Sequence, residues 1–154
     1  MEPMNGYLPV VSAPLAPPRE VSYYVSVELG SLMSQLAACY DAFGYRPTGG
    51  EPPDHIAVEI GFVAYLRLKE AYAMVADDVE SAAIAADAAA RFRSDHLALL
   101  ATPLARLVAG SGIDHLARAA ERLTVYVGPP PAPTRIPLIQ ATDEDGGEFA
   151  CCEA

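Results

Sequence analysis

The stretch EPPDHIAVEIGFVAYL (residues 51–66) joins a stiff turn to a strongly apolar segment. The pair Pro52-Pro53 restricts the backbone, and Asp54 follows where a carboxylate can accept the unpaired N–H groups of a helix start. Beyond it, apolar residues cover more than one side of the expected helix, which is typical of the centre of a helical bundle. The stretch therefore predicts a central helix from Asp54 or His55 to about Ala76.

Apolar periodicity and proline placement predict four further helices around the central one. The first carries a single apolar stripe and ends where Gly44 can cap it. Thr102-Pro103 is typical of an N-cap followed by proline at the first helical position, so it predicts the start of a short helix. The fold class is thus all-α, a compact bundle of about five helices. The four flanking helices are expected at residues 20–43, 78–100, 103–108 and 113–126.

Proline also divides the chain. Five of the 14 prolines lie in residues 1–18 and five in 129–137. A chain of 154 residues is close to one ordinary domain, so we expect a proline-rich lead-in (1–18), a single helical domain (19–128) and a flexible proline-rich, acidic tail (129–154). The lead-in lacks the basic and apolar regions of a secretory signal, which predicts a cytoplasmic protein.

The charge and composition exclude several classes of function. Ten Lys and Arg against 20 Asp and Glu give a net charge of −10, which argues against nucleic-acid binding. No stretch approaches about 20 consecutive apolar residues, so no membrane span is expected. Three cysteines do not make a tetrahedral zinc site, and the sequence lacks a nucleophile elbow, a P-loop and a dinucleotide fingerprint. We expect a binding protein with no catalytic residue, resident metal or cofactor.

The densest polar cluster contains Glu51, Asp54, His55 and Glu59. His55 and Glu59 are four residues apart, so they share a helix face and can pair. One interpretation is a helix start with a salt bridge. The other is a polar rim beside an apolar groove, which would receive a basic peptide.

A second cluster contains Phe92 and His96, which project together from a helix. Taken alone, it is typical of a core phenylalanine beside a hydrogen-bonded, partly buried histidine. His55, Glu59 and His96 also have the residue types of a catalytic zinc site, but two histidines one helical turn apart are missing.

Four segments resemble the TorD-like redox-enzyme maturation chaperones, which include the nitrate reductase delta (assembly) subunits. They are YDAFG (40–44), EPPDHI (51–56), EIGFVAYL (59–66) and FRSDHL (92–97) followed by Pro103 and Leu104. The similarity covers about residues 20–110. It implies a cytoplasmic all-α chaperone whose partner is an immature molybdopterin oxidoreductase catalytic subunit. Pairing with a second copy to form a homodimer is also compatible with it.

The same resemblance implies a peptide-binding site. The leader-binding positions of the family correspond to Pro52, Asp54 and His55, in one block with Glu51 and Glu59. The carboxylates would bind the guanidinium pair of a twin-arginine leader. An apolar groove would hold the segment that follows, with candidate lining residues Phe62, Tyr65, Leu66 and Phe92, and His96 beside them.

The leading hypothesis is a chaperone that binds the twin-arginine leader, or the N-terminal region, of a molybdopterin oxidoreductase subunit. It would hold this client until cofactor insertion and folding are complete before export. Two alternatives stay open: a small metal-dependent hydrolase that uses His55, Glu59 and His96, and a helical scaffold subunit of a stable complex.

Overall fold

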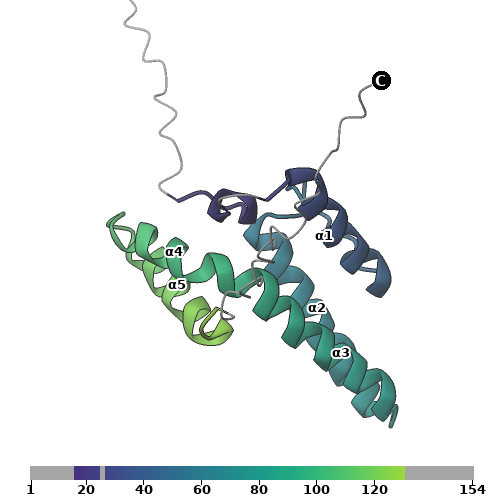
Figure 1. Cartoon of the computed structure of the whole chain (residues 1–154). Coiled ribbons are helices and arrows are strands. Elements are labelled where there is room, and N and C mark those ends of the chain that lie inside the picture. Colours follow the sequence, from purple (N-terminus) through teal and green to yellow (C-terminus); the bar gives the residue numbers. More distant parts are fainter. Residues whose placement is uncertain (1–15, 25–26, 131–154) are drawn as a thin grey trace, which may run out of the picture.

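The computed structural model describes residues 16–24 and 27–130, and within them every regular element is helical (Figure 1). This confirms the all-α fold class. The predicted tails fall largely on residues 1–15 and 131–154, which lie outside the described residues. The elements are a 3₁₀ turn η1 (Glu20–Tyr23), α1 (Leu29–Phe43), α2 (Ile56–Val75), α3 (Val79–Phe92), a π-helical segment η2 (Arg93–Leu97), α4 (Ala98–Ala109) and α5 (Asp114–Val127).

Two antiparallel helical hairpins form the body. In Figure 1, α2 and α3 run side by side as the long hairpin, and α4 and α5 form the shorter one. Alanines at a spacing of three and four residues (Ala82, Ala85 and Ala89) form the buried face of α3, and such small side chains permit close packing against α2. The Asp78 Oδ1 atom caps α3 by accepting a hydrogen bond from the Ser81 N–H over 3.0 Å.

The core is aromatic where α1, α2 and α3 meet. Phe62 of α2 is 1% exposed, and its ring centroid lies 4.8 Å from those of both Tyr40 and Phe92 in edge-on geometry. Tyr45 packs against the same ring, and its hydroxyl donates to the Val58 carbonyl over 3.3 Å. This hydroxyl lies 2.5 Å from the position that a Cβ would take at residue 61, which explains the glycine there. The predicted helix is thus present as α2, but only its first half, up to Leu66, contributes buried residues, and Leu68, Tyr72, Met74 and Val75 in its second half are exposed.

The first predicted helix, residues 20–43, is wrong in its first third. Only Leu29–Phe43 is α-helical, and the chain before it forms the η1 turn and then extends at Tyr24. The reason is tertiary: Glu20 is fully buried and hydrogen-bonded to a histidine 76 residues away, so this segment is held by long-range polar contacts rather than by a helix ladder. Gly44 ends α1 in the left-handed conformation, as predicted (φ 69°).

Residues 79–100 are helical throughout, close to the predicted range of 78–100, but the new helix start predicted at Thr102-Pro103 is wrong. α3 ends at Phe92, η2 follows without a loop, and α4 continues through Pro103 to Ala109. Proline removes one helical hydrogen bond, but the residues around it (Leu100, Ala101 and Leu104) are buried. Packing of this face against the core outweighs the local preference for a break.

Candidate peptide-binding site

Residues 16–24, which we call the N-terminal strap, lie across the start of α2. The Glu20 N–H donates to the Asp54 carbonyl, and the Ile56 N–H donates to the Pro18 carbonyl, each over 2.8 Å. These two bonds form an isolated antiparallel bridge between Arg19 and His55. The predicted leader-binding block is therefore covered on one side by the chain's own N-terminal segment.

Asp54 does not cap α2, contrary to prediction. Its side chain is fully buried and paired with Arg19: the Nε atom lies 2.9 Å and 3.1 Å from the two carboxylate oxygens, and an Nη atom lies 2.8 Å from one of them. The Val21 N–H donates a further, longer bond of 3.4 Å. The capping position belongs instead to His55, whose Nδ1 atom accepts from the Ala57 N–H over 3.2 Å.

His55 does not pair with Glu59 either. Its Nε2 atom lies 3.7 Å from a carboxylate oxygen of Glu51, and the Glu51 side chain is 57% exposed. The predicted pairing on one helix face is wrong because His55 precedes the first turn of α2, where the backbone is still extended. Pro52 contributes to the turn, and its carbonyl accepts from the His55 N–H over 3.0 Å. Glu51 is the exposed carboxylate of this block.

A largely buried polar network connects Glu20 of the strap with His96 and Glu59. His96 Nδ1 lies 3.0 Å and 3.1 Å from the two oxygens of Glu20, and the Tyr24 hydroxyl donates to Glu20 over 2.7 Å. This confirms the expectation of a hydrogen-bonded, partly buried His96, and its ring lies 4.5 Å from Phe92. η2 is the element that carries His96 to this position.

Glu59 is fully buried, and the oxygens of its ionised carboxylate would find no hydrogen-bond donor among the described residues. Burial is the largest cause of a raised pKa at Glu59; together with the nearby charge of Glu20, a hydrogen bond to Glu20 and the charge of Asp54, it raises the pKa to about 10. At neutral pH Glu59 is therefore protonated. The neutral acid gains a donor, which the Glu20 carboxylate can accept.

The predicted apolar lining residues are mainly core. Phe62, Leu66 and Phe92 are at most 4% exposed, although Phe62 and Phe92 border a small cavity of about 260 Å³ that also includes His96. Tyr65 is half-buried, and its hydroxyl donates to the Phe43 carbonyl over 3.1 Å. The structure thus brings Phe62, Phe92 and His96 together, but away from the open surface beside His55.

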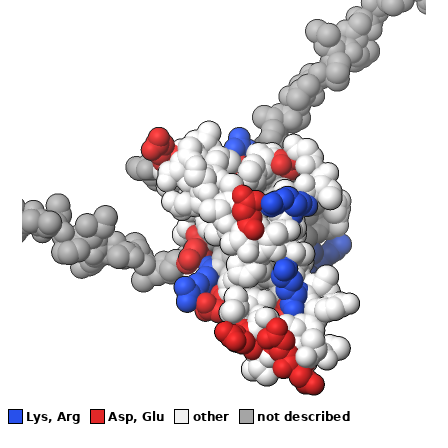
Figure 2. Space-filling view, turned by 90° about the vertical axis from the view of Figure 1, so that its right-hand side faces the viewer, with Lys and Arg blue, Asp and Glu red and all other residues white. Residues whose placement is uncertain are grey.

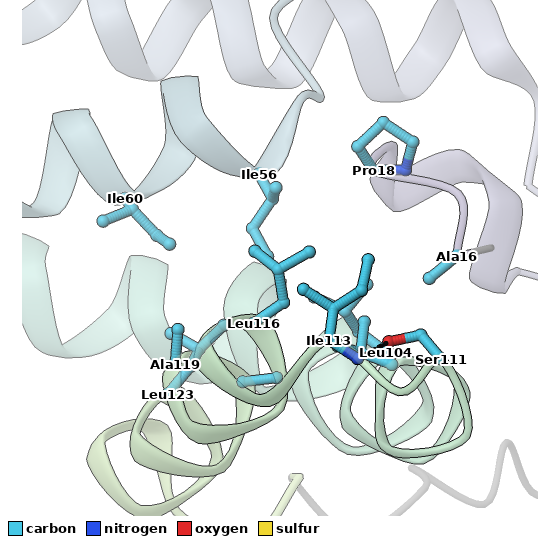
Figure 3. A pocket seen from close by; sticks show the side chains of 12 residues that line it. Ala16, Pro18, Ile56, Ile60, Leu104, Ser111, Ile113, Leu116, Ala119 and Leu123 are labelled. Atoms are coloured by element: carbon cyan, nitrogen blue, oxygen red, sulfur yellow. Dashed lines mark hydrogen bonds between the residues drawn. The ribbon is translucent and has the colours of Figure 1, made fainter. Parts of the chain in front are cut away.

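A larger apolar groove lies where the sequence did not indicate one. It has a volume of about 510 Å³ and lies between the first turns of α2, the α4–α5 hairpin and the strap (Figure 3). Ile60 and Leu116 face it and are 41% and 45% exposed. Its lining is almost wholly aliphatic: Ala16, Pro18, Ile56, Ile60, Leu104, Val108, Ser111, Ile113, Leu116, Ala119, Ala120 and Leu123.

The groove lies next to the polar turn at residues 51–55, because the strap and the start of α2 contribute residues to both. Pro18 lines the groove and is followed by Arg19 on Asp54, while Ile56 lines it and comes directly after His55. The apolar face of the last helix was the one sequence signal that could have indicated the groove. Only the fold shows that this face lies opposite the start of α2. An aliphatic groove beside a carboxylate-bearing turn is suited to a segment that is apolar at one part and cationic at another.

The described residues contain no group of three or more His, Cys, Asp or Glu arranged to hold a metal ion. His55 and His96 have different carboxylate partners, Glu51 and Glu20, and are not brought together with Glu59 as one ligand set. This geometry gives the metal-dependent hydrolase no support. In the described part of the chain, no helix is both long and apolar enough to cross a membrane.

Fold and groove together define an all-helical protein with a peptide-sized apolar site next to buried and exposed carboxylates. A family model described as nitrate reductase delta subunit matches residues 10–106, more than half of the chain. The chain belongs to this family of redox-enzyme maturation chaperones, which confirms the resemblance. No curated protein and no solved structure gives a significant match.

Proposed function

We propose that the chain is a cytoplasmic, system-specific chaperone that binds the twin-arginine leader, or the N-terminal region, of a molybdopterin oxidoreductase subunit. It holds this client until cofactor insertion and folding are complete before export. Family membership supports the general chaperone role. The observation that carries the finer proposal is the aliphatic groove of about 510 Å³ beside the Glu51–His55 turn.

The chemistry of a leader matches the two parts of this site. Its apolar segment would bury against Ile60 and Leu116, whose present exposure leaves apolar surface in water. Its guanidinium groups would bind carboxylates, for which a planar fork of donors is the preferred partner. Glu51 is accessible for this purpose, and Asp54 already binds one guanidinium group.

The described surface is also electrostatically compatible with a cationic client. Figure 2 shows acidic side chains gathered at the lower end of one face, where α2 turns into α3, and Asp77, Asp78 and Glu80 are exposed there. With a net charge of −10 the whole chain attracts cations at long range. Affinity should be moderate, because an extended leader loses conformational entropy when it binds.

A charged side chain in the groove tests the proposal. Ile60→Lys places an ammonium group on the groove wall, and we expect it to weaken binding of a synthetic twin-arginine leader peptide at least about tenfold in calorimetry. Leu68→Lys is the matched control, because Leu68 lies two turns further along α2, is 63% exposed and does not line the groove. Circular dichroism verifies that both variants keep their helices. Equal affinities of Ile60→Lys and Leu68→Lys for the peptide would contradict the assigned groove.

A further inference from the structure

We propose that the N-terminal strap is an internal competitor of the client: Arg19 occupies the Asp54 carboxylate that an incoming arginine needs, and the strap lifts as that arginine replaces Arg19. The inference rests on the proposed function, and it adds how the site is closed and what chemistry opens it. The competing ligand is an arginine-bearing peptide.

The ion pair between Arg19 and Asp54 has the geometry expected of a bound client. Arg19 contacts both oxygens of Asp54 at 2.8–3.1 Å, which is the forked contact expected of a bound client arginine. Asp54 is fully buried, so its two oxygens have no room for a second guanidinium group while Arg19 is present. Occupancy by Arg19 and by a client is therefore mutually exclusive at this carboxylate.

The strap also lies at the edge of the apolar groove. Ala16 and Pro18 form part of its wall, next to Ile56, so the strap limits access to the same groove that would hold the apolar part of the client (Figure 3). One segment thus places an arginine on the carboxylate and apolar residues on the groove. These are the two chemical features that the site would recognise in a client.

The strap is attached by noncovalent contacts that a competing peptide can replace. Outside the Arg19 pair, it is held by the two backbone bonds to Asp54 and Ile56, by the bond from Val21 and by the contacts of Glu20 with His96. Partly buried side chains of the strap (Ala16, Val21, Tyr23 and Tyr24) also pack against the core. The Arg19 side chain is 37% exposed, so water and a competitor reach it. The buried carboxylate cannot be left unpaired, so the strap lifts only when another guanidinium group replaces Arg19.

This exchange predicts selectivity for arginine over lysine. A lysine ammonium group makes no forked contact with the two oxygens, so it replaces Arg19 poorly. A leader peptide with both arginines changed to lysine should therefore leave the strap in place. The same reasoning predicts that removal of the Arg19 guanidinium group strengthens binding of the arginine peptide. The peptide then no longer competes with a closed state in which Arg19 occupies Asp54.

Hydrogen exchange on the full wild-type chain is the direct test. The amides of Glu20 and Ile56 donate the two bonds that hold the strap, so a saturating twin-arginine peptide should accelerate exchange at both by at least about tenfold, whereas the twin-lysine peptide should not. In calorimetry, Arg19→Gln should bind the arginine peptide about tenfold more tightly than the wild type. Arg46→Gln, which removes an exposed ion pair with Asp41, is the matched control and should bind like the wild type.

The outcomes separate the two proposals. Peptide binding with unchanged or slower exchange at Glu20 and Ile56 would overturn the competitor role and leave the proposed function standing. Unchanged or weaker binding by Arg19→Gln, with helical content intact, would do the same. If neither the wild type nor Arg19→Gln binds the peptide, both proposals fail. The exchange measurement needs no variant, so it decides even if Arg19→Gln does not fold.

Discussion

Three carboxyl groups are fully buried in this small helical domain: those of Glu20, Asp54 and Glu59. Each is stabilised in the interior in a different way. Asp54 has a guanidinium partner, and Glu20 has a histidine and a tyrosine hydroxyl. Glu59 has neither, so it keeps its proton. At the scale of single residues, this neutral acid is the feature whose consequence is easiest to measure.

Glu59→Gln should stabilise the protein increasingly as pH rises. The pKa of about 10 in the folded protein lies above the ordinary value of 4.5, so the stabilising contribution of the neutral acid is complete below about pH 4.5 and is lost as pH rises through about 10. At pH 7 the loss in the wild type is on the order of 3 kcal/mol relative to low pH, and the amide does not ionise. Urea unfolding between about pH 5 and pH 9 measures the difference in the free energy of unfolding between Glu59→Gln and the wild type.

Glu80→Gln is the control for that measurement, since Glu80 is exposed in the first turn of α3. Its stability should follow the wild type in parallel at every pH. If the difference between Glu59→Gln and the wild type does not grow with pH, Glu59 is not the buried neutral acid described above.

Residue types at this site were predictable from the sequence, but their partners were not. The dense polar turn and the Phe92–His96 pair are visible as local patterns. Arg19 and Asp54 are 35 residues apart, and Glu20 and His96 are 76 apart, so no helical spacing connects them. Spacing rules report neighbours on one helix, which is why they paired His55 with the wrong carboxylate.

At the scale of elements, the passage from α3 through η2 into α4 carries the chain onward without a loop. Helix existence was well predicted, because apolar periodicity and Gly44 are strong local signals. Two helix boundaries were predicted wrongly: the start of α1 and the break expected at Pro103. The sequence shows only local preferences there, whereas the burial of Glu20, Leu100 and Leu104 depends on the whole fold. In both places tertiary packing outweighed the local helix preference.

Pro103→Ala should stabilise the protein. Proline inside α4 deprives the helix of one backbone hydrogen bond, and alanine is about 3 kcal/mol more favourable in a helix interior, so a gain of about 1–2 kcal/mol remains after some lost packing. Urea unfolding monitored by circular dichroism gives the value. A stability equal to or below the wild type would mean that the proline ring itself is needed where α4 packs.

At the scale of the whole molecule, the groove arises only because the α4–α5 hairpin and the start of α2 meet under the strap (Figures 1 and 3). No single segment of sequence contains it. The family match ends at residue 106, before α5, so the α5 wall of the groove lies beyond the matched part. Because no local pattern contains the groove, the sequence placed the apolar site on core residues such as Phe62 and Leu66 instead.

The proposed chaperone cycle predicts transient rather than permanent association. When the tagged chain is purified from cells, the unfinished, cofactor-free client subunit should co-elute, whereas the mature exported enzyme should not contain the chain. Ile60→Lys should reduce this co-elution and Leu68→Lys should not, as in the peptide assay. Finding the chain as a lasting component of the mature enzyme would favour a scaffold subunit instead.

The pairing of Asp54 with Arg19 has a practical consequence for laboratory preparations. Trimming the first 19 residues, or fusing a bulky purification handle just ahead of Ala16, would alter the very contact that keeps Asp54 engaged. Such material would give client affinities that differ from those of the chain in which Arg19 still pairs with Asp54.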